Sequence, residues 1–481
     1  MNKLIFLLAI PLLVFFNSGC RENNAEPIAA QNEINTFIWG SMNSWYYWQN
    51  EVVNLKDTHF EDLSSLHTFL NTFNQPADLF ESLRHTDDRF SWIVDDYIAL
   101  QNTFQGTSKS FGFEYGLVRL SATADSVVGY VQYVLPASPA EAAGLKRGDL
   151  FYAVNGVRLT TQNYRDMRAL ESYSLALCTY QNLQLTPTTN TPVMNAVLLT
   201  ENPVLLAKTL LFENKKIGYI VYTGFTHTFH SELNAAFAQL QAEGAEELVL
   251  DLRYNPGGSI YTALFLGSMI YNQANEQDIL AKLVYNAKHP ESNFDFPFFT
   301  ELYVLNGNYD VIRTEPLARL SLNRVYFLTG RGTASASELI INGLDPYMET
   351  RQIGATTVGK NEASVTLYDS PASNYRDEKT ANPNHLWAIQ PIVAKLTNVV
   401  GFGDYVGGIV PDIALDEVSF FNRLMPLGDP NETLLHAALL DIAGLPGPAR
   451  VEAPGDYQLI DQSLQENQHE GGMVLNGLDW E

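Results

Sequence analysis

A serine and a lysine, each set among glycine and other small residues, are the side chains in this sequence best suited to chemistry. Ser335 lies in the run Gly-Thr-Ala-Ser-Ala-Ser-Glu, and Lys360 follows further along in Val-Gly-Lys. A serine hydroxyl becomes an effective nucleophile when a neighbouring base takes its proton, and a lysine amine can be that base. The pair predicts acyl transfer, with Ser335 as nucleophile and Lys360 as general base. Ser337, two steps along the predicted helix, points elsewhere.

Lys360 can act as a base only if its amine is neutral. A free lysine has a pKa near ~10.4, and burial among apolar groups lowers it. Apolar neighbours such as Val358 and Ala363 favour that burial. Glu362 opposes the shift, because alternation along a strand would place its carboxylate on the same face as the amine.

Acyl transfer also needs backbone N–H donors for the developing oxyanion. Gly257 and Gly258 form a turn in which no Cβ obstructs the approach to the backbone. The N–H of Ala336, directly after the serine, is the natural second donor. These residues are therefore the predicted oxyanion hole.

Alternating strands and helices must position these turns. Apolar runs and helical periodicity predict strands at 217–222, 247–253 and 325–329, and helices at 230–242, at 261–270 and directly after the serine. This alternation predicts βαβ units with a largely parallel sheet, whose ligands bind at the carboxyl ends of the strands. Both the glycine turn and Ser335 fall at such ends. The predicted fold class is α/β, with several domains.

A β-rich region at 109–203 precedes this core and resembles a PDZ domain of the kind found in bacterial proteases. The resemblance rests on the run Ser-Pro-Ala-Glu-Ala-Ala-Gly-Leu-Lys-Arg-Gly-Asp at 138–149 and the strand and Asn-Gly turn after it. It implies that Phe111, Gly112 and Phe113 lie at a carboxylate-binding loop, where a peptide C-terminus adds as a strand. A PDZ fold kept as a structural gate is the alternative.

Four segments, in the same order, resemble the carboxyl-terminal processing peptidases, also called tail-specific proteases. They are 251–258, 333–338, 354–360 and the closing segment 407–412. The resemblance covers about 109–415 and implies a core like those of ClpP and crotonase, with a preceding or inserted PDZ domain. It implies a Ser335–Lys360 serine endopeptidase that needs no cofactor and acts on proteins or peptides, possibly through their C-termini. Family members often have a glutamine four residues after the lysine; Ser364 stands there and is the candidate for orienting the amine.

The N-terminus has the pattern of a bacterial lipoprotein signal. Lys3 precedes an apolar run at 4–16, and small residues lead into Cys20. Asn17 departs from the aliphatic residue usual at that position, and a plain secreted protein is the alternative. We expect a protein lipid-anchored at Cys20 in the cell envelope, at the outer membrane of a bacterium. Cys178 is the only other cysteine, so lipidation of Cys20 would leave no intramolecular disulfide.

Aromatic residues at helical spacing predict a small helical domain before the β-rich region, a weaker match to exported Bacteroidetes-type members of the family. The predicted divisions are a signal peptide at 1–20, tether and helical domain at 21–108, PDZ domain at 109–203, catalytic core at 204–445 and a weakly structured tail at 446–481.

Other classes of function fit less well. A net charge of −25 over 481 residues argues against nucleic acid as a partner, since phosphate binding needs clustered cations. His227 and His230 have the spacing of metal ligands but no third ligand, so we interpret them as a helix-start pair and predict no metal. Two alternatives stay open: a non-catalytic peptide- or lipid-binding protein on the same fold, and an enzyme held latent by its accessory domains.

Overall fold

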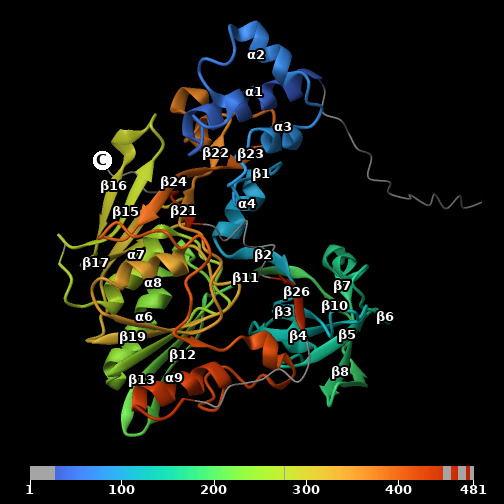
Figure 1. The fold of residues 1–481 in the computed structure, drawn as a ribbon, viewed down its shortest axis with the longest axis vertical. Coiled ribbons are helices and arrows are strands. Elements are labelled where there is room, and N and C mark those ends of the chain that lie inside the picture. Colours follow the sequence, from blue (N-terminus) through green and yellow to red (C-terminus); the bar gives the residue numbers. More distant parts are fainter. Residues whose placement is uncertain (1–27, 276, 448–456, 464–472, 477–481) are drawn as a thin grey trace, which may run out of the picture.

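The computed structural model describes residues 28–275, 277–447, 457–463 and 473–476. The predicted signal peptide and Cys20 lie outside these residues. Three lobes are visible: a helical lobe at the top, an α/β core below it and a β-rich lobe to one side (Figure 1). Within the described residues, no helix combines the length and the apolar character needed to cross a bilayer.

The core is built on a six-stranded sheet. In spatial order its strands are β12 (Val204–Phe212), β13 (Lys215–Tyr222), β14 (Glu247–Asp251), β19 (Arg324–Thr329), β20 (Glu349–Gly354) and β25 (Ile413–Ala414). Neighbours from β13 to β25 pair in parallel, whereas β12 pairs with β13 antiparallel. The predicted α/β class and largely parallel sheet are confirmed.

Four helices cover the two faces of this sheet. They are α6 (His230–Glu243), α7 (Ile260–Ile270), α8 (Ala336–Leu344) and α9 (Thr433–Ala443). α6, α7 and α8 share one apolar cluster with one face of the sheet, and α9 shares another with the opposite face. Successive side chains of a strand point to opposite faces of the sheet, so each strand contributes to both apolar clusters. In β14, Leu250 belongs to the first cluster and Val249 to the second.

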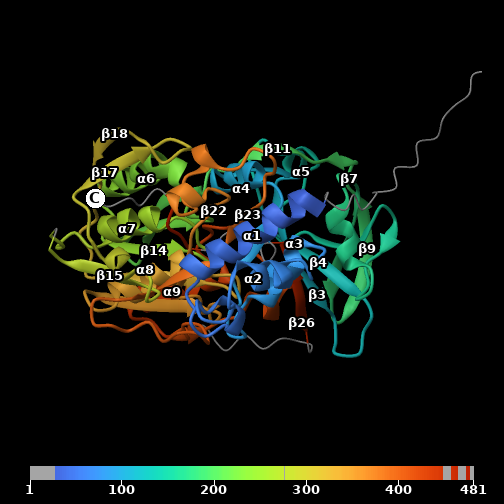
Figure 2. The same ribbon diagram turned by 90° about the horizontal axis from the view of Figure 1, so that it is seen from above.

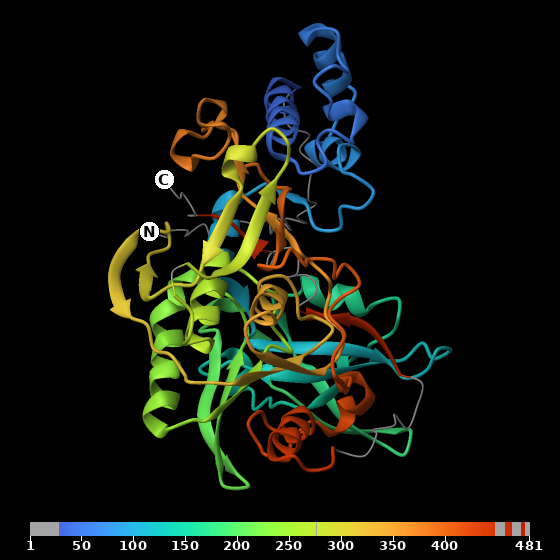
Figure 3. The same ribbon diagram turned by 60° about the vertical axis from the view of Figure 1, so that its left-hand side comes forward.

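A second sheet stands over the carboxyl end of the core. Its order is β16 (Phe294–Pro297), β15 (Ile279–Tyr285), β24 (Ile392–Thr397), β21 (Glu362–Ser364) and β27 (Met473–Val474), and the hairpin of β17 (Glu301–Leu305) and β18 (Val311–Pro316) lies outside it. β21 follows Lys360 directly. The strands β15 and β16 rise alongside the helical lobe (Figure 3).

The β-rich lobe is an antiparallel sheet with its own core. The strand order is β26 (Gln458–Gln462), β3 (Phe113–Arg119), β4 (Val127–Val134), β5 (Leu150–Val154), β8 (Leu175–Gln181) and β9 (Gln184–Asn190), with β6 (Val157–Arg158), β7 (Ser172–Tyr173), β10 (Met194–Asn195) and the short helix α5 (Pro139–Ala142) beside it. Its edge strand β26 comes from the region predicted as a weakly structured tail.

The helical lobe lies above the junction between the core and the β-rich lobe (Figure 2). It contains α1 (Ile28–Trp45), α2 (Leu63–Leu70) and α3 (Pro76–Ser82), followed by β1 (Trp92–Val94), α4 (Tyr97–Phe104) and β2 (Thr107–Ser110). β1 pairs with β23 (Ala388–Gln390), which pairs with β22 (Leu367–Tyr368), and β2 pairs with β11 (Val197–Thr200). Strand pairing thus joins the N-terminal segment to the core through β23 and to the end of the β-rich region through β11.

Candidate active site

Ser335 stands in a strained turn between β19 and α8. Its φ is 63° and its ψ is −114°, a region that residues with a Cβ seldom adopt and that costs about 1–3 kcal/mol. The Ser335 carbonyl accepts the first helical bond, from Leu339 N at 2.8 Å. The side chain is fully buried, and its Oγ has no hydrogen-bond partner. An Oγ without a hydrogen-bond partner is available to a neighbouring base, as a nucleophile requires.

Asn255 joins the glycine turn to the serine turn. Its carbonyl accepts bonds from Ala334 N and Ser337 Oγ, each at 3.2 Å. Its side-chain Oδ1 accepts from Gly257 N at 2.9 Å, and its Nδ2 donates to Tyr222 O. Ser337 therefore fastens the turn, in keeping with its assignment as the bystander serine.

The two glycines have the backbone freedom that the predicted oxyanion hole needs. Their φ values are 111° at Gly257 and 134° at Gly258, and a Cβ on Gly258 would lie 2.4 Å from Phe225 O. The N–H of Gly257 is already bonded to Asn255. The N–H groups of Gly258 and Ala336 are therefore the better placed donors, and the oxyanion hole stays a prediction.

Glu338 links the serine turn to the lysine segment. Its fully buried carboxylate accepts from Ser335 N at 2.7 Å, and from Gly359 N at 2.7 Å and Lys360 N at 2.8 Å. It also accepts from Thr357 Oγ1 at 2.5 Å. Burial raises the pKa of Glu338, and these four hydrogen bonds oppose the rise. One carboxylate thus binds the backbone N–H groups of both the predicted nucleophile and the predicted base. The sequence pattern assigned no role to Glu338, although its place three residues after the serine was an available signal.

Lys360 is buried, with 2% of its surface exposed. Burial lowers its pKa to about 8, against the opposing charges of Glu362, Asp88 and Glu338. Glu362 is the strongest of these opposing carboxylates, so the tension expected from the sequence exists. Burial of Glu362 raises its own pKa, which weakens that opposition.

Residues of the helical lobe complete the surroundings of the lysine. The ring of Phe90 lies 4.9 Å from Lys360 Nζ, and the Arg89 guanidinium donates to Gly359 O at 2.5 Å and Val406 O at 3.2 Å. Sequence reasoning missed both side chains. They lie far from Lys360 along the chain, and the only local signal was the charged run before the strand at Trp92.

Buried polar atoms without partners gather at this site. Besides Ser335 Oγ they include Asn361 Oδ1, Glu362 Oε2 and the Tyr405 hydroxyl. Such atoms are costly, and their clustering is typical of a functional site. Because Ser335 Oγ is among them, the serine and the lysine amine are not hydrogen-bonded in this structure. Catalytic hydrogen bonds are often long before substrate binds.

Ser364, the candidate for orienting the lysine, lies on β21. Its Oγ donates to Met473 O and accepts from Gln390 Nε2, both at 3.1 Å. Its role in orienting the amine stays a prediction.

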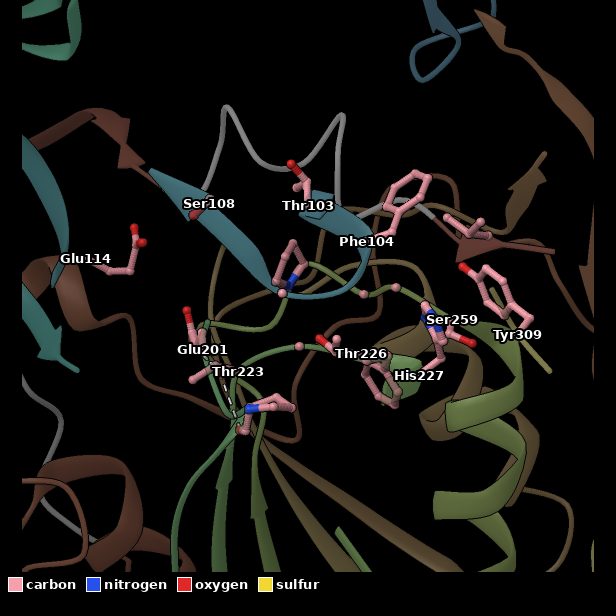
Figure 4. Close-up of a pocket in the computed structure, with 18 of the residues that line it drawn as sticks. Thr103, Phe104, Ser108, Glu114, Glu201, Thr223, Thr226, His227, Ser259 and Tyr309 are labelled. Atoms are coloured by element: carbon pink, nitrogen blue, oxygen red, sulfur yellow. Dashed lines mark hydrogen bonds between the residues drawn. The ribbon is translucent and has the colours of Figure 1, made fainter. Parts of the chain in front are cut away.

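A pocket of about 140 Å³ reaches from the β-rich lobe to the glycine turn (Figure 4). Glu114 of β3 lines one end, and Gly258 and Val474 line the other. Glu201 lies between them; burial raises the pKa of this carboxyl, while hydroxyl donors Thr223 and Tyr133 oppose the rise. The pocket connects the predicted peptide-binding lobe with the predicted oxyanion hole.

Buried ion pairs hold the β-rich lobe against the core. Arg147 donates to Glu417 at 2.8 Å and to Met425 O at 2.7 Å, and it also contacts the hydroxyl of Tyr254, three residues before Gly257. In the core, Arg253 pairs with Asp251 and bidentately with Glu432. Buried charged side chains of both lobes therefore lie close to Tyr254, just before the glycine turn.

The other residues singled out from the sequence, in the predicted carboxylate-binding loop and in the histidine pair, make contacts within the fold. The ring of Phe111 lies 4.1 Å from that of Tyr173, and Gly112, with φ of 79°, donates its N–H to Ser110 Oγ. His230 bonds to Tyr303 O and Thr262 Oγ1 as the first residue of α6, and His227 stacks on Tyr309. No group of three potential metal-ligating side chains occurs in the described part of the chain.

Three regions of the chain are similar to known protein families. The profile of peptidase family S41 matches residues 216–413, that of the peptidase S41 N-terminal domain residues 33–92, and that of a PDZ domain residues 130–170.

Among curated relatives, the carboxy-terminal processing protease CtpA of Bacillus subtilis is 26% identical over 335 residues, or 69% of this chain and 61% of the relative. The carboxyl-terminal-processing protease of Picosynechococcus is 26% identical over 286 residues, covering 58% and 61%. This chain thus spans 61% of the length of these relatives. A crystal structure from Bacteroides fragilis, assigned to the S41 proteases, is 27% identical with a TM-score of 0.66, covering 85% of this chain and 97% of that one.

Proposed function

Because this chain belongs to peptidase family S41 and carries a PDZ domain, we propose that it is an exported serine endopeptidase that cleaves protein substrates. The observation that carries the proposal is the Glu338 carboxylate, which binds Ser335 N and Lys360 N at once. It supports the proposal by joining the backbones of the proposed nucleophile and the proposed base, which are separate in the sequence.

The chemistry follows from these positions. The neutral Lys360 amine takes the proton of Ser335 Oγ, which attacks the substrate carbonyl. The N–H groups of Gly258 and Ala336 bind the oxyanion, and the lysine then protonates the leaving amine. A water molecule, activated by the same amine, hydrolyses the acyl-enzyme and releases the acid. The pKa of about 8 allows the lysine to give and take protons near neutral pH.

Hydrolysis of casein and of a peptide with an apolar C-terminus tests the proposal. Ser335→Ala and Lys360→Ala are expected to lower kcat/KM by about 10³-fold or more, since each removes a member of the catalytic pair. Ser337→Ala is the matched control and should retain most activity. Covalent labelling by a fluorophosphonate should occur in the wild type and vanish in Ser335→Ala. Undiminished hydrolysis in both catalytic variants would contradict the dyad.

We propose further that the PDZ domain recognises substrates near their C-termini. Support comes from the loop at Phe111–Phe113 and from the pocket that leads from Glu114 to Gly258. A peptide with a free carboxylate is expected to have a lower KM than the same peptide ending in an amide. Equal KM values for the two would argue for the PDZ fold as a structural gate.

We also propose that the protein is anchored by a lipid on Cys20 in the bacterial cell envelope, at the outer membrane. The support is the sequence pattern of Lys3, the apolar run and the small residues before the cysteine. Metabolic labelling with an alkynyl fatty acid should mark the wild type but not Cys20→Ser, and the wild type should fractionate with outer membranes. Labelling that persists in Cys20→Ser would exclude this anchor.

A further inference from the structure

The edge of the PDZ sheet is covered by the chain's own C-terminal region. β26 pairs antiparallel with β3, with Gln458 opposite Arg119 and Gln462 opposite Gly116. The tail therefore runs toward the start of β3, where the Phe111–Phe113 loop lies. This is the direction in which a peptide that ends at that loop would add to the sheet.

Side chains of β26, and of Tyr457 just before it, pack on both faces of the strand. Leu459 and Tyr457 pack against the cluster that contains Tyr180 and Phe421, while Ile460 packs against the core of the PDZ sheet. Just after the strand, Ser463 Oγ accepts from Tyr115 N at 2.8 Å. The tail thus makes the main-chain and side-chain contacts of a bound peptide strand, without using a terminal carboxylate.

The same tail returns at the catalytic site. Met473, Val474 and Leu475 are at most 4% exposed. Val474 N donates to Gly258 O at 3.1 Å, and Leu475 N donates to Ser364 O at 3.1 Å. β27 lies parallel to β21, the strand that follows the catalytic lysine, and bridges to Ser259 on its other side.

The pocket lies between these two tail contacts. Glu114, whose carboxylate accepts from Ser463 Oγ, lines its PDZ end (Figure 4). Val474 lines its other end, where its N–H donates to Gly258 O. An extended polypeptide that runs from the PDZ edge to the glycine turn would have to follow the same edges, β3 and β21. Two peptides cannot pair with one strand edge at the same time.

We propose that the C-terminal tail, through residues 457–463 and 473–476, is an intramolecular ligand that occupies both peptide-binding edges and competes with substrate polypeptides. The inference rests on the proposed function for its effect on activity, and on strand pairing alone for its binding site. A tethered strand competes at an effective concentration of order millimolar, so substrates must displace it or the tail must be removed. The enzyme is latent while the tail is bound.

Binding is tested without catalysis. In the Ser335→Ala background, a fluorescein-labelled peptide of residues 457–476 should bind saturably to the chain lacking 457–481, and about tenfold or more weakly to the full chain. A peptide of scrambled sequence is the control. Failure of the peptide to bind a truncated chain that is folded by circular dichroism would overturn the proposal.

Activity is tested with two truncations and a point variant. Deletion of 464–481 frees only the catalytic edge, and deletion of 457–481 frees both; each should raise kcat/KM for a tailed peptide by about fivefold or more. Because Leu459 and Ile460 are packed and Met473 to Leu475 are buried, either deletion can unfold the chain. Each truncated protein is therefore checked by circular dichroism, and Val474→Asp in the full chain provides a second readout. Gln458→Asp, at an exposed position of β26, is the matched control.

The outcomes separate the two proposals. If the full chain is active, and the truncated and Val474→Asp proteins remain folded but are no more active, then the tail does not inhibit the enzyme and the inference is wrong. Peptide binding with no hydrolysis by any form would establish the tail site and refute the peptidase function.

Discussion

The protonation state of one residue, Lys360, sets the rate of the proposed reaction. With a pKa of about 8, roughly one tenth of the amine is neutral at pH 7, against about one part in three thousand at the ordinary value of 10.5. Only the neutral form accepts the serine proton, so fluorophosphonate labelling of Ser335 should rise with pH and level off above about 8. The measurement is the second-order labelling rate between pH 6 and 10.

The control is the thermal stability of the chain over the same range, which must stay high enough to exclude unfolding as the cause. A labelling rate that keeps rising tenfold per pH unit to pH 10 would mean that the amine titrates at its ordinary value.

Glu338 acts at the same scale, because its carboxylate accepts from the backbone N–H groups of both proposed catalytic residues. Glu338→Gln replaces one acceptor oxygen by an NH₂ group that faces N–H donors. We expect the variant to lose about 2–4 kcal/mol of stability and at least ~10-fold in labelling rate. Glu349→Gln, exposed on β20, is the control for thermal denaturation and labelling. Unchanged labelling in a stable Glu338→Gln protein would show that the link is dispensable.

At the scale of elements, the segment between α3 and β1 forms a wall of the lysine site. Phe90 both shields the Lys360 amine from water and presents its ring face 4.9 Å away. Phe90→Ala admits water and should move the midpoint of the pH–labelling curve upward. Phe90→Leu keeps the shield but removes the cation–π contact, worth about 0.5–2 kcal/mol to the charged form, and should move the midpoint downward.

Opposite shifts from two substitutions at one position would not arise from general destabilisation. If both variants have the same midpoint as the wild type, Phe90 does not affect the pKa of Lys360 and contributes only to packing.

At the scale of the whole molecule, buried polar contacts of Arg147 join the PDZ lobe to the core. Removing one partner of a buried ion pair costs about 3–5 kcal/mol, because the other charge remains buried. Arg147→Met should therefore loosen the PDZ lobe and split thermal unfolding, followed by calorimetry, into two transitions. Arg158→Met, an exposed arginine of the same lobe, should unfold as the wild type does. A single transition at the wild-type temperature in Arg147→Met would show that other contacts couple the lobes.

Local patterns in the sequence determined much of this fold. The predicted strands at 217–222 and 325–329 and the helix at 230–242 agree with β13, β19 and α6 to within about two residues, because their burial follows simple periodicities. The resemblance to the family follows from the short sequence motifs around Ser335 and Lys360, because a strained serine turn and a glycine turn need particular residues at fixed positions.

Tertiary structure alone decided how the site is completed. Arg89 and Phe90 reach Lys360 only because β1 pairs with β23, and the tail reaches Gly258 and β21 only through strand pairing over long stretches of chain. Strand pairing and burial depend on partners distant in the sequence, and no local pattern encodes them. The sequence thus predicted which residues do the chemistry, and the fold decided what surrounds Lys360 and what pairs with the edges of β3 and β21.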